Sequence, residues 1–482
     1  MAGSRTIGGC VLGAAFTPRR SDLGEMLRLA VPVVTVQVGL MFMGVVDTVM
    51  VGHLSKEALA AVALGNVYVF ASICVGMGIL MVMDPIVSQA VGAGDTVAVA
   101  RGVQRGLVLA LVLTVPCTLV LLPGEAVLGW LHQPPDVVPL AAQYTRATLA
   151  GMFPFFAFIV FRQTLQAMNR MAPIVWIIVA GNLVNVALNY GLIYGHWGLP
   201  ALGVVGSGYA TAVGRTVLGA GLLVLAWPVL RPTLLPPRSD ALDPTPLLRM
   251  VRLGAPIAVT MELEYGAFAV VGLMMGTLGT LQMAGHQVAL NLASLTFMVP
   301  LGVSGAGAVL VGQAIGRGDG DGMRRAAGAA LVIGVGFMAC TAVVFMLVPG
   351  AFAGLYTSDP DVYALATLLI PIAGVFQVFD GTQAVTVGIL RGAGDTTAPM
   401  VINVLGFWLV GVPVSLFFGF GLHGGPVGLW WGFVAGLAAV AFFLVLRLRG
   451  RFKRSVDRIV IDLSHTGEHP RADPPMEVPS VM

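Results

Sequence analysis

Three carboxylic acids, Asp47, Glu264 and Asp380, stand inside long apolar stretches of this 482-residue chain. An ionised side chain within a membrane costs at least about 2.5 to 3.5 kcal/mol on insertion scales, so such residues are typical of ion pathways. A carboxyl group in a low dielectric is harder to ionise and can exchange a proton near neutral pH, and once ionised it attracts a cation. We therefore expect the three acids to couple a driving ion to a cationic ligand. The alternatives are a structural hydrogen-bonding role and, for Asp47 near a helix end, simple solvation.

A group of amides and a hydroxyl accompanies these acids. Asn185 and Asn189 are four residues apart, so they share one helix face that can point toward Asp47. Amide oxygens are ligands for hard cations, and amide N–H groups can donate to a carboxylate. A structural role, in which the two Asn side chains form hydrogen bonds between helices, explains them equally well. Thr211 is a weaker candidate, because its hydroxyl can bond to its own helix.

Other polar residues carry less information. His286, Gln287 and Asn291 are weak candidates for binding a substrate, and an interhelical contact explains them equally well. Asp84 and Arg215 also lie in apolar stretches. An ion pair between them would offset the cost of placing each charge in the membrane, but the sequence does not place them in contact.

The composition indicates that most of the chain lies in a lipid bilayer. Of its residues 57% are hydrophobic and 10% are charged, whereas soluble domains carry about 25% charged residues. The net charge of +3 is spread over loops and a tail, which does not favour nucleic-acid binding. Phosphate-binding and hydrolase motifs of the GxxxxGK[ST], HExxH and GxSxG types do not occur. The cysteines are too widely spaced for a disulfide framework or a metal site: Cys10, Cys74, Cys117 and Cys340.

Twelve apolar runs are long enough to cross the membrane as helices, which need about 20 residues each. The predicted spans are 27–51, 58–83, 102–122, 138–168, 174–194, 204–230, 247–277, 283–315, 326–348, 362–390, 400–420 and 427–446. The fold class is therefore an all-α polytopic membrane protein.

Basic residues divide unevenly between the loops. One alternate set of loops holds eleven arginines from Arg101 to Arg391, whereas the other set holds Lys56 near its helix ends. Because cytoplasmic loops retain Lys and Arg, we expect both termini in the cytoplasm. The predicted organisation is a cytoplasmic tail (1–21), a first lobe (22–230), a proline-rich linker (231–246), a second lobe (247–450) and a tail (451–482) that is basic and then disordered.

The two halves of the chain repeat. Residues 85–95 match residues 308–319, with Gln89 and Gln313 224 positions apart, and residues 28–32 match residues 252–256 at the same offset. A six-span repeat keeps its orientation, so the lobes should be related by an axis along the membrane normal. A ligand would then bind between the lobes near the midplane.

These features together resemble the multidrug and toxic compound extrusion (MATE) family, in its NorM-like branch. The resemblance covers essentially all twelve spans and is carried by three stretches. They are MGVVDTVMVGH at residues 43–53; Ala255-Pro256-Ile257 followed by Glu264 and by GHQVALN at 285–291; and Asp380 followed by LRGAGDT at 390–396. The chain departs from the expected pattern at Asp84 and Arg215, so the resemblance does not identify the substrate.

The resemblance implies two six-helix lobes, of the MATE/MOP type, that open alternately to either side of the cell membrane. It implies a secondary antiporter, not an enzyme, that exports organic cations or drugs in exchange for H+ or Na+, and that needs no cofactor and no metal beyond a coupling sodium ion. Asp47, Asn185, Asn189 and Thr211 would form the site of the first lobe, and Glu264 with Asp380 that of the second. The expected partners are small organic cations and the lipid bilayer, with the chain acting as a monomer.

Two rival functions remain. A flippase for lipid-linked sugars shares the two-lobe architecture, but its anionic pyrophosphate substrate calls for clustered Arg or Lys in the cavity, and here acids predominate. A membrane-embedded acyl or glycosyl transferase needs a paired nucleophile and base or a metal cluster, for which the sequence offers no candidate.

Overall fold

The computed structural model describes residues 16–462, and every regular element in that range is a helix. Twelve helical segments of this range are long and apolar enough to cross a membrane, six in each half. The first half comprises α2 (Arg20–Gly52), α3 (Lys56–Leu80), α4 (Met83–Gly92), α5 (Thr96–Leu121), α7 (Val138–Thr148), α8 (Met152–Ala167), α9 (Ala172–Tyr194) and α10 (Val204–Leu225). The second comprises α12 (Pro244–Leu278), α13 (Thr280–Gly316), α14 (Gly320–Leu347), α16 (Pro360–Gly392), α17 (Thr397–Val404), α18 (Val412–Leu416) and α19 (Gly425–Phe452).

Two of the predicted span ends differ from the structure for identifiable reasons. The second span was predicted to end at Met83, but α4 continues it to Gly92 because the charge of Asp84 is compensated inside the protein by Arg391. The sixth was predicted to reach Leu230, but α10 ends at Leu225. There Pro228 starts a new short helix, α11 (Trp227–Leu234), which extends into the segment predicted as a linker.

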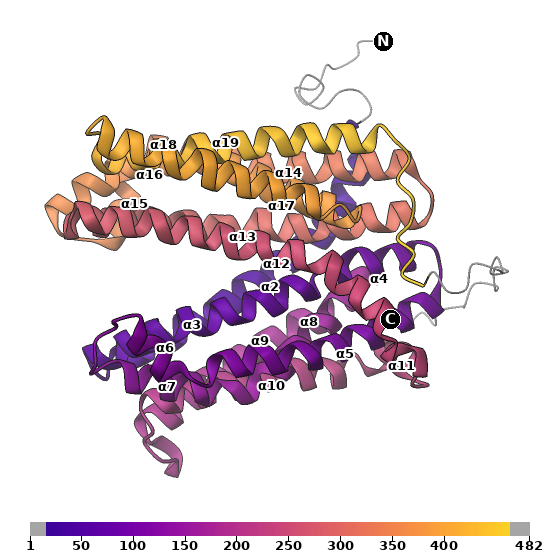
Figure 1. Cartoon of the computed structure of the whole chain (residues 1–482), viewed down its shortest axis with the longest axis horizontal. Coiled ribbons are helices and arrows are strands. Elements are labelled where there is room, and N and C mark those ends of the chain that lie inside the picture. The colour runs from indigo at the N-terminus through magenta and orange to yellow at the C-terminus, as the bar shows by residue number, and fades with distance from the viewer. Residues whose placement is uncertain (1–15, 463–482) are drawn as a thin grey trace.

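The helices form two lobes that meet at one end of the molecule and diverge toward the other (Figure 1). The lobes diverge toward the short helices α6 (Gly124–Trp130) and α15 (Pro349–Tyr356). They meet at the opposite end, where α2 begins and α19 ends, and we call this the tail end. Phe16 and Phe452 stack there with ring centroids 6.2 Å apart, so the start of the described chain and the end of α19 lie on the same side.

The internal repeat is visible in matched contacts between the lobes at the tail end. Gln89 donates to the Gly392 carbonyl at 3.0 Å, and its repeat mate Gln313 donates to the Ala167 carbonyl at 2.7 Å. Two glycines allow this close approach: a Cβ on Gly92 would lie 2.1 Å from the Gln313 carbonyl oxygen, and one on Gly316 would lie 2.1 Å from that of Gln89. The pseudo-twofold packing thus depends on glycine at both equivalent positions.

The chain after α19 crosses from the second lobe to the first. The sequence predicts disorder after about Arg454, whereas residues 455–462 lie against the bundle (Figure 1). Arg458 pairs with Asp95 at 2.9 Å, and Asp462 pairs with Arg105 at 2.8 Å. The charges of residues 455–462 thus meet opposite charges on the first lobe, which the sequence did not predict. The remainder of the predicted tail, residues 463–482, and Cys10 lie outside the described residues.

Candidate functional site

Four of the predicted site residues meet inside the first lobe. Asp47 projects from α2, with 2% of its surface exposed, and accepts hydrogen bonds from three side chains. Asn185 and Asn189, one turn apart on α9, donate to Oδ1 at 3.1 and 2.6 Å. Thr211 on α10 donates to Oδ2 at 2.7 Å. The Thr211 hydroxyl also lies 3.0 Å from the Ser207 carbonyl and has one proton to give to either acceptor. The two amides and this hydroxyl can therefore stabilise an ionised carboxylate at this position.

A wider polar network surrounds this carboxylate. Tyr144 on α7 donates to Asn66 on α3 at 2.7 Å and is close enough to Asp47 for a direct electrostatic interaction. Arg215 lies one helical turn after Thr211 on α10, and its charge also acts on Asp47. Its guanidinium lies 5.3 Å from the centre of the Phe155 ring, while Nη1 is buried without a hydrogen-bond partner among the described residues. Arg215 is thus a partly buried positive charge near Asp47, although the two side chains do not form an ion pair.

Little of this wider network was predictable from the sequence. Tyr144 and Asn66 were missed because an isolated Tyr or Asn in an apolar run is usually a local packing residue. Arg215 was noticed, and the partner considered for it was Asp84, with no contact predicted. The spacing of Thr211 and Arg215, four residues apart on one helix, is a signal that could have placed Arg215 near Asp47.

The two predicted acids of the second lobe have far fewer partners. Glu264 on α12 accepts one side-chain hydrogen bond, from Gln383 on α16 at 3.1 Å. Asp380, also on α16, is 5% exposed, and its Oδ1 has no hydrogen-bond partner within residues 16–462. The two carboxyl groups lie near enough to repel each other when both are ionised. This repulsion and the few donors favour holding a proton or capturing a cation.

Glu264 opens onto a cavity of about 290 Å³ between the lobes. The cavity lies between α3 of the first lobe and α12, α13, α16 and α17 of the second. Its polar groups include Glu264, Gln383 and Arg391, and most of its wall is apolar or aromatic, including Phe70, Met81, Met261, Tyr265, Phe268 and Phe297. Phe70 and Tyr265 contact each other across the lobes with ring centroids 5.5 Å apart. An acid among aromatic faces is a suitable environment for an organic cation.

Asp84 forms an ion pair with Arg391 and not with Arg215. The Asp84 and Arg391 side chains, 4% and 8% exposed, meet at 3.0 Å and join α4 of the first lobe to α16 of the second. Arg162 on α8, which was not predicted as a site residue, adds a second charge near Asp84 and donates to Gln37 at 3.0 Å. Arg391 looks like a loop arginine in the sequence, so its buried position was not predictable from charge pattern alone.

The weak substrate-binding candidates lie outside the cavity. His286 is 3% exposed and packs against Trp430 with ring centroids 5.6 Å apart. Gln287 and Asn291 are exposed, and none of the three residues lines the 290 Å³ cavity. The structure therefore does not bring these residues together with Glu264.

Comparison with known proteins places the chain in a family. The MatE family model matches residues 32–191 and 256–417, which include Asp47, Glu264 and Asp380. The chain belongs to the MATE family. It is 40% identical over 441 residues to a probable multidrug resistance protein NorM of Rhizobium meliloti (strain 1021), covering 90% of this chain and 93% of that protein. It is 35% identical over 449 residues to the multidrug resistance protein MdtK of Pectobacterium atrosepticum, covering 91% and 98%.

Solved structures share the fold. A multidrug resistance MATE family transporter of the MOP superfamily in an outward-facing conformation superposes with a TM-score of 0.81 at 22% identity, covering 90% of this chain and 96% of that one. The resemblance to the MATE family and the prediction of twelve spans in two lobes are thereby confirmed. The protein is a multi-pass membrane transporter rather than an enzyme.

Proposed function

We propose that this MATE protein is a secondary antiporter that exports organic cations, drugs included, in exchange for H+ or Na+. The observation that carries the proposal is the position of Glu264, a scarcely hydrogen-bonded carboxyl group on an aromatic cavity between the two lobes. Burying an ionised carboxyl without partners is costly, so a proton, a metal cation or a cationic substrate stabilises it. Relatives named as multidrug resistance proteins support the same substrate class.

Exchange requires that substrate and driving ion compete for the same carboxyl groups. In the proposed cycle the substrate binds when Glu264 and Asp380 are ionised, the lobes move, and protonation or sodium binding releases it. Each elementary charge that enters the cell provides about 2.3 kcal/mol per 100 mV. This free energy corresponds to a bias of roughly fiftyfold between the two states.

The proposed orientation has the tail end in the cytoplasm. The basic loops and the end of α19 with Arg449 and Arg451 support it, because cytoplasmic segments retain positive charge. With that orientation, the present arrangement is closed toward the cytoplasm by the Gln89, Gln313 and Asp84–Arg391 contacts. These contacts must separate when the lobes open to the inside.

The proposal is tested by ethidium efflux from proteoliposomes under separately imposed proton and sodium gradients. Efflux driven by either gradient is expected for the wild type. Glu264→Gln should lower gradient-driven efflux by about tenfold or more, because an amide cannot exchange a proton or bind a cation as a charge. Glu262→Gln, two residues away and outside the cavity, is the matched control and should retain efflux. Wild-type efflux in the Glu264 variant would refute the assignment.

Flipping of a lipid-linked sugar is the rival that the same assay separates. A pyrophosphate substrate needs free guanidinium groups in the cavity, and Arg391, which lines it, is engaged by Asp84 at 3.0 Å. Absence of efflux under both gradients, with the protein correctly inserted, would favour the flippase.

A further inference from the structure

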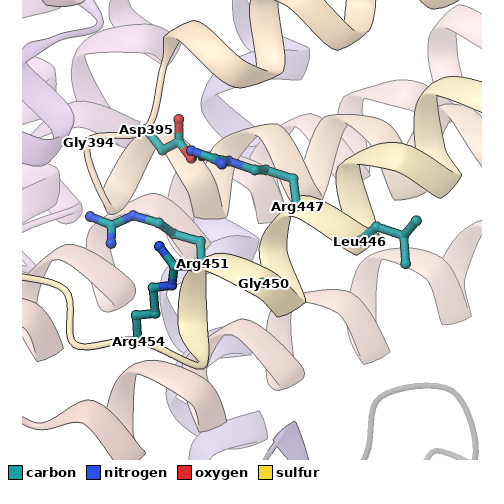
Figure 2. A pocket seen from close by; sticks show the side chains of 7 residues that line it. All are labelled: Gly394, Asp395, Leu446, Arg447, Gly450, Arg451 and Arg454. Carbon is teal, nitrogen blue, oxygen red and sulfur yellow. Dashed lines mark hydrogen bonds and ion pairs between the residues drawn. The ribbon is translucent and has the colours of Figure 1, made fainter.

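Three arginines converge at the end of α19. Arg447, Arg451 and Arg454 follow one another at spacings of four and three residues, so they lie on one side of the helix and of the turn that continues it. Together with Leu446, Gly450 and the Gly394–Asp395 turn between α16 and α17, they line a hollow of about 680 Å³ (Figure 2). The hollow is distinct from the cavity at Glu264, although Asp395 in the α16–α17 turn lines both.

The charges around this hollow do not balance. Among the described residues that line it, Asp395 is the one acid, and it pairs with Arg447 at 2.8 Å. The side chains of Arg451 and Arg454 extend to the same side of the hollow (Figure 2), and neither forms an ion pair with any carboxylate within residues 16–462. Two guanidinium groups brought together repel each other, and an anion bound between them removes that repulsion. The planar donors of arginine are suited to phosphate oxygens.

The hollow lies at the level of lipid headgroups. Helix α19 has 28 residues and is about 42 Å long, whereas the hydrocarbon core is about 30 Å thick, so its last turns leave the hydrocarbon. The residues just before them are apolar and exposed: Phe443, four residues before Arg447, is 55% exposed, and Leu446, which lines the hollow, is 45% exposed. A phosphate with attached acyl chains can contact both the arginines and this apolar surface.

We propose that this hollow binds the headgroup of an anionic phospholipid, with its phosphate between Arg451 and Arg454 and its acyl chains along Phe443 and Leu446. Basic pockets at membrane interfaces recognise such headgroups, and each Arg near the surface adds an electrostatic attraction to anionic lipids. The apolar surface beside the arginines favours a lipid over a soluble phosphate. The site does not depend on the proposed transport activity, and with the proposed orientation it lies in the cytoplasmic leaflet.

Native mass spectrometry of the purified full chain, titrated with phosphatidylglycerol or phosphatidylcholine, measures this binding. The wild type is expected to retain phosphatidylglycerol in preference to phosphatidylcholine. Arg451→Gln combined with Arg454→Gln should weaken the retention of phosphatidylglycerol by about tenfold. The matched control, Arg317→Gln combined with Lys453→Gln, removes the same charge from exposed residues outside the hollow and should change retention by less than about twofold.

Two outcomes would overturn the proposal. Equal losses in both double variants would mean that the tail end attracts anionic lipids only by its overall charge. The second outcome is tested by measuring the binding of inorganic phosphate to the protein in detergent without anionic lipid. Saturable phosphate binding that displaces phosphatidylglycerol and is lost in the Arg451/Arg454 variant would assign the hollow to a soluble phosphorylated ligand. Failure of ethidium efflux would leave this binding unaffected, so the two proposals fail independently.

Discussion

The two lobes are repeats of one another, yet they hold their buried acids in opposite ways. Asp47 in the first lobe accepts hydrogen bonds from three side chains and has Arg215 as a counter-charge. In the second lobe Glu264 accepts one side-chain hydrogen bond, and the Oδ1 atom of Asp380 has no partner among the described residues. Repetition of the fold therefore did not preserve the electrostatic environment of its acids.

This difference predicts a division of roles. A carboxylate surrounded by donors and a cation is stable when ionised and is part of the packing of its lobe. A carboxyl group with few partners gains from each proton or cation that binds, so its state changes readily. We expect the acids of the second lobe to dominate coupled transport, and Asp47 to contribute more to the stability of the first lobe.

The largest expected effect is on transport in Asp380→Asn. The amide has nearly the same shape but cannot change charge, so ethidium efflux under an imposed gradient should fall by about tenfold or more. Its thermal midpoint in detergent should be unchanged or higher, because an unpartnered buried carboxyl is removed. Efflux at the wild-type level would contradict the proposed difference between the lobes, since transport would then not depend on this acid.

Asp47→Asn should have its largest effect on stability. The change leaves Arg215 without its counter-charge and removes a charged acceptor from Asn185, Asn189 and Thr211, which together destabilise the folded state by about 3 kcal/mol. Thermal unfolding in detergent should show a lower midpoint for this variant than for Asp380→Asn. If Asp380→Asn is the less stable of the two, the proposed division of roles is reversed.

Much of this arrangement was open to prediction from the sequence. Charged residues are rare in apolar runs, so Asp47, Glu264 and Asp380 stood out, and the four-residue spacing of Asn185 and Asn189 indicated one shared face. The offset between Gln89 and Gln313 likewise indicated two equivalent lobes.

Contacts between helices were harder to predict, because periodicity defines the faces of one helix but not the helix that packs against it. Asp84 was therefore not linked to Arg391, and Arg162 was passed over although it lies nearby. In the sequence, the arginines at 447, 451 and 454 resemble ordinary cytoplasmic charge. In the structure they line one hollow together with the Gly394–Asp395 turn. The path of residues 455–462 depends on ion pairs with distant residues in the same way.

A double-mutant cycle on Asp47 and Arg215 sharpens the comparison further. If Arg215 stabilises the first lobe mainly through Asp47, then Arg215→Met should destabilise the wild type more than it destabilises the Asp47→Asn variant. We expect a coupling free energy of about 1 kcal/mol from thermal unfolding of the four proteins, which is within the range for residues that share one polar network. Additive effects would show that Arg215 acts through Phe155 packing and not as a counter-charge.

The smallest expected effect is on efflux in His286→Leu, which tests whether sensitivity in the second lobe belongs to the acids or to any buried polar group. His286 is buried beside Trp430 and outside the cavity, and its Nδ1 has no partner among the described residues. Replacing it with an apolar side chain removes an unsatisfied polar atom, so stability should be unchanged or slightly higher. Ethidium efflux should stay within about twofold of the wild type, because the variant keeps Glu264, Gln383 and Asp380. A loss as large as that in Asp380→Asn would place the substrate path along α13 and remove the basis for assigning coupling to the two carboxyl groups alone.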